Sequence, residues 1–245
     1  MVDLRTDVLV QAYLYARNAV VAAGFLDEIQ YHESLCFDCV KESDFLREAA
    51  WVILCSGTSE AVIRRKFPHI SHAFLDWRSA ESIVENRNQS RAAALVLYAH
   101  AGKIDAILEI ASAIARDGFP LIRASIKHSG VDYLRHFSYL GPATSLHLAK
   151  NIGLDVVKPD RHLVRISSVF GYDSPREMCQ KISEAVGDRL PVVDTIFWRY
   201  ATIERMYTSR LRELLHRGAP QNVFVRFNTP ANRDHRTERD HRHTF

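Results

Sequence analysis

The chain has 245 residues, of which 47% are hydrophobic and 25% are charged, a composition that supports a buried core and argues against a disordered chain. No stretch approaches the roughly 18 uninterrupted apolar residues of a membrane-spanning helix. The first residues include Asp3, Arg5 and Asp7 and do not resemble a signal peptide, so we expect a soluble, intracellular protein.

The charged residues are distributed unevenly along the chain. Residues 1–60 hold 4 Lys and Arg against 10 Asp and Glu, a net charge of −6, whereas residues 61–245 hold the other 28 against 19, a net charge of +9. A basic surface for a polyanion such as nucleic acid and an ordinary solvated surface both agree with this division.

Apolar residues recur with helical spacing along almost the whole chain, and strand patterns are weak. The first predicted helix covers residues 7–23, and its apolar stripe consists of Val8, Ala12, Tyr15, Ala19 and Ala22, with Gly24 as the C-cap. Further helices are predicted from Ser43 to Ser56, over 60–67 with a stop at Pro68, and over 88–99, 103–116, 131–137, 161–169, 175–186, 192–200 and 209–217. The sequence therefore predicts an all-α protein of roughly ten short helices.

A tight turn is predicted between two of these helices, at residues 139–142. Gly141 is expected to supply an unusual φ, and Pro142 suits the first turn of the next helix. We expect three main-chain N–H groups to remain unpaired at the start of that helix, those of Ala143, Thr144 and Ser145. Such a helix end suits a phosphate, although an ordinary packing corner has the same pattern.

A second motif follows at residues 158–165. Asp160 lies after Pro159 and before the helical run that begins at Arg161, so its side chain is expected at an N-cap. On its own, this pattern predicts a capping aspartate and no more.

Taken together, the two motifs resemble the helix-hairpin-helix DNA glycosylase superfamily, which contains endonuclease III, the adenine mismatch glycosylase and the alkylbase glycosylases. Tyr139–Ser145 matches the hairpin pattern of the family, and Pro159–Arg165 matches the stretch that carries its aspartate. The separation of 16 residues between Thr144 and Asp160 also matches. The specific similarity covers residues 139–165, and a weaker similarity extends over residues 40–200.

The resemblance implies a two-lobed helical architecture with an active-site cleft between the lobes. One lobe is expected to combine residues 1–40 with 160–225, and the other to cover residues 41–159 with the helix-hairpin-helix at about 131–152. Residues 226–245 contain many Arg and His side chains and are expected to form a basic, flexible tail.

The resemblance also implies hydrolysis of the N-glycosidic bond of a flipped-out base in double-stranded DNA, with Asp160 as the catalytic residue. The residues expected to bind DNA are Tyr139, Gly141, Ala143, Thr144, Ser145 and Arg161. The residues expected to line the substrate pocket are Trp51, Tyr133, His136, His162 and Trp198. Damaged bases and hypermodified bases of phage DNA both remain open as substrates, and the latter would indicate a defence role.

One departure from the family bears on the reaction. Its bifunctional members carry a lysine in the hairpin where this chain has Ala143, which favours a monofunctional enzyme. A glycosylase with abasic-site lyase activity that uses Lys150 or Lys158 is an alternative, and so is a noncatalytic DNA-binding protein.

No resident cofactor is expected. Cys36 and Cys39 form one CxxC pair, but only His32 lies near them as a further zinc ligand. The C-terminal four-cysteine motif of some iron–sulfur glycosylases is absent, because only Cys179 lies in the second half of the chain. The resemblance implies a monovalent cation at the hairpin, and a monomer in a prokaryotic-type cytoplasm, associated with the nucleoid and not with a membrane.

Overall fold

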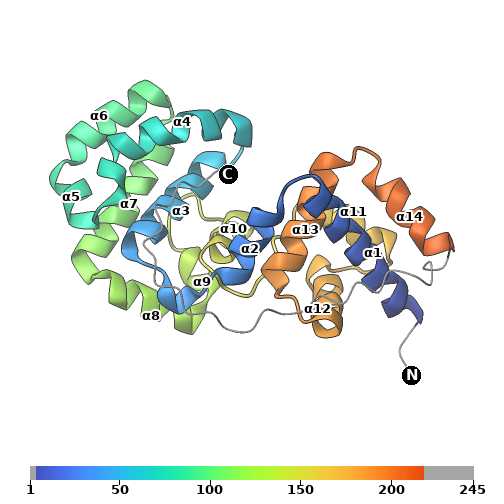
Figure 1. The fold of residues 1–245 in the computed structure, drawn as a ribbon. Coiled ribbons are helices and arrows are strands. Elements are labelled where there is room, and N and C mark those ends of the chain that lie inside the picture. The colour runs from blue at the N-terminus through green and yellow to red at the C-terminus, as the bar shows by residue number, and fades with distance from the viewer. Residues whose placement is uncertain (1–3, 218–245) are drawn as a thin grey trace, which may run out of the picture.

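The computed structural model describes residues 4–217, and every regular element in that part of the chain is a helix (Figure 1). The predicted all-α class is therefore confirmed. The α-helices are α1 (Leu4–Ala22), α2 (Leu26–Ser34), α3 (Glu42–Cys55), α4 (Glu60–Ala73), α5 (Ala80–Glu85), α6 (Arg87–Leu97), α7 (Ala101–Asp117), α8 (Phe119–Ser129), α9 (Val131–Leu134), α10 (Pro142–Asn151), α11 (Arg161–Val169), α12 (Pro175–Val186), α13 (Leu190–Ile203) and α14 (Tyr207–Arg217). Two short 3₁₀ helices, η1 (Phe37–Cys39) and η2 (Leu75–Trp77), complete the set.

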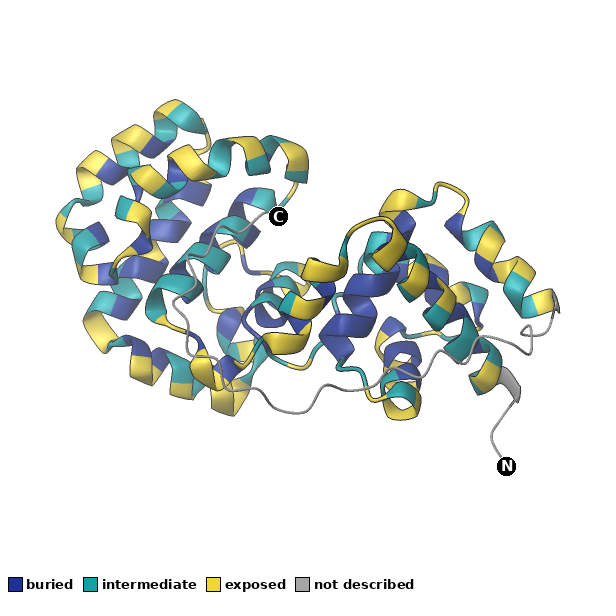
Figure 2. Ribbon diagram, in the orientation of Figure 1, coloured by how far each residue is buried: buried dark blue, intermediate teal, exposed yellow. Residues whose placement is uncertain are grey.

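The buried hydrophobic residues of the described chain form two clusters (Figure 2). The first, which we call the central cluster, runs from Phe37 to Ile152 and is built by η1 and α3 to α10. The second, the terminal cluster, combines α1 and α2 with Val157 and α11 to α14. The chain crosses between the clusters twice, before Phe37 and after Ile152. Residues far apart in the sequence therefore meet where the clusters adjoin.

Local capping explains the helices whose predicted bounds are correct. Asp160 caps α11, and Ser174 caps α12 through a bond from the main chain of Glu177 to its hydroxyl. Gly187 ends α12 with φ of 82°, in the left-handed region that favours glycine. These signals depend only on neighbours in the sequence.

The predicted stop at Pro68 is wrong, because α4 continues through this proline to Ala73. Proline removes one intrahelical hydrogen bond, but Ile63 and Ile70 are both fully buried, one on either side of it. Burial on both sides thus outweighs the local penalty. Helices α2, α5 and α8 were not predicted, since they are short or begin next to Gly and Pro.

The predicted apolar stripe of the first helix is also displaced. Tyr15 is 45% exposed, whereas Tyr13 is fully buried and packs edge-on against Phe197, with the ring centroids 5.7 Å apart. The buried side of α1 comprises Leu9, Ala12, Tyr13, Ala16 and Val20. Helix α1 is apolar on more than one side, so the sequence alone does not show which side faces α13.

No single helix within residues 4–217 is long and apolar enough to cross a membrane; only the pair Thr6–Ala22 and Leu26–Ser34, bent by 116°, meets the length and composition criteria together. The predicted tail at 226–245 and the end of the predicted lobe beyond residue 217 lie outside the described residues.

Candidate active site

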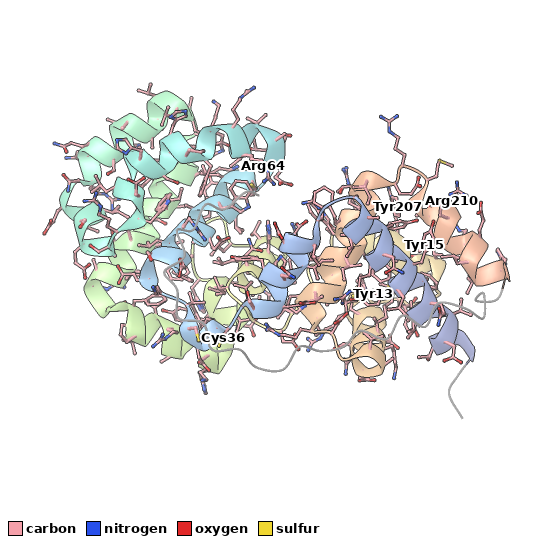
Figure 3. The ribbon with its side chains drawn as sticks, in the orientation of Figure 1. Tyr13, Tyr15, Cys36, Arg64, Tyr207 and Arg210 are labelled. Atoms are coloured by element: carbon pink, nitrogen blue, oxygen red, sulfur yellow. The ribbon has the colours of Figure 1, made fainter. Side chains whose placement is uncertain are left out.

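A cavity of about 650 Å³ lies where the two clusters adjoin. The central cluster contributes α3, α4 and α10 to its walls, including Trp51, and the terminal cluster contributes α2, α13 and the segment before α11, including Trp198. Figure 3 shows Arg64, another lining residue, at the edge of α4 that faces the terminal helices. This volume suits a ligand of the size of a nucleobase with its sugar.

Asp160 lines this cavity from the start of α11. Its Oδ1 accepts hydrogen bonds from the main-chain N–H groups of His162 at 2.8 Å and Leu163 at 3.0 Å, which confirms the predicted N-cap. Its Oδ2 accepts no hydrogen bond from any described residue. The cap therefore fixes the carboxylate while one oxygen stays available to a ligand.

A buried ion pair supports the segment that carries Asp160. Lys150 Nζ lies 2.6 Å from Asp194 Oδ1, and the side chains of the two residues are 8% and 2% exposed. Asp194 Oδ2 accepts the main-chain N–H of Lys158 at 2.6 Å. Burial raises the pKa of Asp194, and Lys150 opposes that shift. The pair links α10 and α13 to the chain just before the catalytic candidate.

Lys158 also lines the cavity, close to Asp160 and to His147 of α10. Its Nζ lies 3.3 Å from His147 Nδ1, a distance at which the amine can donate to the imidazole. Burial and the charge of Lys150 both lower the pKa of Lys158. Burial likewise lowers the pKa of His147, with Lys158 as the next cause. Both groups therefore favour their neutral forms more than they would in water.

The turn before α10 differs from the prediction in its backbone. Gly141 has φ of −71°, which any residue adopts, whereas Tyr139 has φ of 64°. The unusual conformation predicted for Gly141 is therefore wrong, and the neighbouring tyrosine adopts it instead. The Tyr139 ring packs edge-on against His100 at 5.8 Å and lies close to Gly102. Contact with the start of α7 explains why the tyrosine is held in this conformation.

The start of α10 has fewer unpaired N–H groups than predicted. The main-chain N–H of Ser145 donates to the carbonyl of Gly141 at 2.9 Å, and Ser145 is fully buried. Ala143 and Thr144 line the cavity, and their main-chain N–H groups have no hydrogen-bond acceptor among residues 4–217. The anion site expected at this helix end is thus reduced to two donors.

The other predicted site residues divide into two groups. Trp51 and Trp198, both predicted as pocket residues, line the cavity. Tyr133, His136 and His162 do not line it, so the expectation is corrected for these three. Tyr133 and His136 pack on each other near α9, and His162 Nδ1 lies 3.2 Å from the hydroxyl of Tyr207, whose position Figure 3 marks. The predicted DNA-binding residues Tyr139, Gly141 and Arg161 are exposed outside the cavity lining.

A buried lysine holds the loop after α3, which contributes Ser56 and Thr58 to the cavity rim. Lys103 of α7 is 3% exposed, and its Nζ donates to the carbonyl of Leu54 at 2.8 Å and to that of Ser56. The same Nζ lies 3.3 Å from Thr58 Oγ1. The ammonium thereby compensates the negative end of the α3 dipole and fixes the rim loop.

Several polar lining residues were not predicted as site residues, among them Arg47, Glu48 and Asn151. The first two lie in the helix predicted from Ser43 to Ser56, and charged residues in a helix are usually solvent-exposed, so the sequence provided no reason to expect them in a pocket. Glu48 lies one helical turn before Trp51, so the two share a side of α3. That spacing is a sequence signal that could have identified Glu48, but it does not extend to Asn151, which lies in α10.

Within residues 4–217, no three His, Cys, Asp or Glu side chains lie close enough together to hold a metal ion. No protein-family model, curated protein or solved structure matches this chain.

Proposed function

We propose that this protein is a DNA N-glycosylase that hydrolyses the bond between a flipped-out base and its deoxyribose and leaves an abasic site. The observation that carries the proposal is that Asp160 and the first turn of α10 face one cavity, although they belong to different motifs of the sequence. A carboxylate and a set of main-chain N–H donors are the groups that suit a sugar cation and a phosphate.

Cleavage of the N-glycosidic bond develops positive charge on the sugar, and the departing base takes the bonding electrons. Asp160 Oδ2, which has no partner among the described residues, is the atom available to stabilise this charge. The same carboxylate accepts a proton from the water that attacks C1′. The cap on Oδ1 keeps the side chain in place during both steps.

Recognition of the DNA follows from the position of the cavity. A base within a duplex cannot reach Asp160, so the nucleotide rotates out of the stack into the cavity at a cost of a few kcal/mol. The N–H groups of Ala143 and Thr144 bind a phosphate of the same strand, and Trp51 and Trp198 provide aromatic surface for the base. The two clusters correspond to the two lobes, with the cavity as the cleft between them.

The proposal is tested by incubating the full chain with labelled duplexes that each contain one damaged or modified base, followed by alkaline cleavage at abasic sites and mass spectrometry of the released base. We expect Asp160→Asn to lower base release by about 100-fold or more, while duplex binding changes by less than about threefold. Asp160→Asn retains an N-cap side chain, so its fold is preserved.

Asp155→Asn is the matched control for this substitution. Asp155 Oδ1 also accepts a main-chain N–H, that of Leu190 at 3.1 Å, but Asp155 does not line the cavity. We expect full base release from the control. Absence of release from every duplex in a panel of oxidised, alkylated, mismatched and phage-type bases, or full release by Asp160→Asn, would contradict the proposal.

A second candidate activity is cleavage of the strand at the abasic site. The environment of Lys158 favours it, because this amine lines the cavity with a lowered pKa, whereas Lys150 is held in its ion pair with Asp194. The Lys158 amine would condense with the C1′ aldehyde, with loss of water, to form an imine. Loss of the C2′ proton and departure of the 3′ phosphate would then break the strand.

Borohydride reduction on a duplex with a preformed abasic site tests this activity separately from base release. If Lys158 is the nucleophile, a covalent adduct forms, peptide mapping locates it at residue 158, and Lys158→Gln abolishes it. An adduct at another lysine would exclude Lys158 as the nucleophile, and the absence of any adduct would leave a purely hydrolytic enzyme.

A further inference from the structure

Glu48 is a carboxylate of the cavity wall for which the proposed hydrolysis has no use. Its side chain is 14% exposed, and it lies on α3 one turn before Trp51. Glu48 Oε1 accepts a hydrogen bond from Arg47 Nη2 at 3.1 Å, and Oε2 accepts one from Asn151 Nδ2 at 3.0 Å. Burial raises the pKa of Glu48, while the bonds from Arg47 and Asn151 oppose this shift and favour the ionised form.

These two bonds do not saturate the carboxylate. Arg47 contacts one oxygen and Asn151 contacts the other, so no single group bridges both. Each carboxylate oxygen has two lone pairs, and one on each remains available. Glu48 therefore presents two adjacent acceptors toward a ligand in the cavity, flanked by two donor side chains.

Glu28, a lining residue from α2, differs from Glu48 in its hydrogen bonds. Its two oxygens accept bonds from Arg199 Nε at 2.7 Å and Nη2 at 3.0 Å, so one guanidinium fork covers its front. Asp194 also accepts separate bonds on its two oxygens, from Lys150 Nζ and from the main-chain N–H of Lys158, but its side chain is only 2% exposed, against 14% for Glu48. Of these three carboxylates, Glu48 alone combines separate donors on its two oxygens with a side chain that is accessible from the cavity.

Two adjacent acceptors select among the edges of the bases. On the edge used in base pairing, guanine has two neighbouring donors, N1–H and the 2-amino group, followed by the O6 acceptor. Adenine and cytosine have an amino donor beside an acceptor nitrogen, and thymine has one donor between two acceptors. The two Glu48 oxygens and a donor from Arg47 or Asn151 form, in this order, an acceptor, an acceptor and a donor. This order is complementary to the pairing edge of guanine.

We propose that Glu48 is the specificity-determining residue of the cavity and that the released base is a guanine derivative with its pairing edge intact. This inference rests on the proposed glycosylase function, whose substrate class it names. The carboxylate binds N1–H and the 2-amino group together, and a donor from Arg47 or Asn151 meets O6. A base without the 2-amino group leaves one carboxylate oxygen unsatisfied, which is costly in a buried site.

The test compares pairs of duplex substrates that differ only in the 2-amino group, namely 8-oxoguanine with 8-oxohypoxanthine and 7-methylguanine with 7-methylhypoxanthine. Duplexes with 3-methyladenine and with uracil are included. We expect the wild-type chain to release one or both guanine bases, and at least about tenfold faster than the partner without the amino group. We expect Glu48→Gln, which presents only one acceptor oxygen, to reduce this ratio to less than about threefold.

Glu28→Gln is the matched control, since it removes a different carboxylate from the same cavity. We expect the ratio of the two release rates to remain at its wild-type value in this variant. The ratio of the two release rates is insensitive to a loss of folded protein. Glu48→Asp is a second variant, and it keeps both acceptor oxygens of the carboxylate. Release of adenine- or pyrimidine-derived bases only, or an unchanged ratio in Glu48→Gln, would overturn this inference and leave the glycosylase function intact. Absence of release from every duplex would overturn both.

Discussion

Lys150 and Asp194 form a buried ion pair at 2.6 Å, and the second oxygen of Asp194 fixes the main chain of Lys158 at the same distance. The pair thus joins α10 of the central cluster, α13 of the terminal cluster and the segment that leads to Asp160. Its effect on the candidate site is indirect: it positions the chain from which the carboxylate projects.

The first prediction concerns this pair. Asp194→Asn leaves the Lys150 ammonium buried without a counter-charge, and we expect the free energy of unfolding to fall by about 3–5 kcal/mol. Urea denaturation measures the change. Asp105→Asn is the control, because Asp105 pairs with Arg91 at a surface where the two side chains are 36% and 40% exposed. That substitution is expected to cost no more than about 1 kcal/mol. Equal losses in both variants would contradict a larger contribution of the buried pair to the stability of the fold.

The second prediction separates DNA binding from folding at Gly141. A methyl group there meets no atom closer than Thr144 Oγ1 at 4.0 Å, and φ of −71° suits alanine, so stability should change by less than about 1 kcal/mol. The same methyl group lies on the N-cap residue of α10, the helix whose first N–H groups are proposed to bind the phosphate. We expect Gly141→Ala to weaken duplex binding by about tenfold or more in fluorescence anisotropy.

Gly130→Ala provides the opposite control. Gly130 has φ of 58° and does not line the cavity, so alanine there is expected to lower stability by about 1–3 kcal/mol without a change in duplex affinity. Unchanged binding by Gly141→Ala would exclude the turn from the DNA interface.

The third prediction is a pH dependence of stability that originates at His32. Burial, with the charges of Lys150 and Arg189, lowers the pKa of this imidazole from 6.5 to about 3. Between these two values the unfolded chain binds a proton at His32 and the folded chain does not. The free energy of unfolding therefore decreases as the pH falls from 6.5, by up to about 1.4 kcal/mol per pH unit from this group.

Urea titrations at pH 7, 6 and 5 measure this slope. His32→Leu removes the titrating group and is expected to flatten the decrease, although His147, whose pKa is lowered as well, retains its own contribution. His128→Gln, on the exposed side of α8, is expected to leave the slope unchanged. A slope that is the same in His32→Leu and in the wild-type chain would contradict the neutral state of the buried imidazole.

The helices whose bounds could be predicted are those with a local start or stop signal. Asp160 and Ser174 cap their helices through neighbouring main-chain groups, and Gly187 ends α12 by its own conformation. Pro68 shows the limit of such signals, because its local cost is smaller than the burial of Ile63 and Ile70. The destabilising effect of the proline can be predicted from the sequence, but the packing that outweighs it cannot.

The turn at residues 139–142 shows the same limit for backbone conformation. Glycine was expected to adopt the unusual φ because only its intrinsic freedom is visible in a sequence. In the structure, contact with His100 and Gly102 places Tyr139 in that conformation instead. A contact with a helix far away in the sequence thus decided which residue carries the strain.

By itself, the sequence determined the helical class, the capped starts of α11 and α12, and the resemblance that singled out Asp160. Only the tertiary structure decided that the cavity lined by Asp160, Trp51 and Trp198 also contains Glu48 and does not contain Tyr133, His136 or His162. The physical reason is that helical spacing and caps act over a few residues, whereas a cavity forms where two separately packed clusters adjoin. Which side chains face the cavity depends on how the two clusters pack against each other, and this packing cannot be predicted from the spacing of residues along one helix.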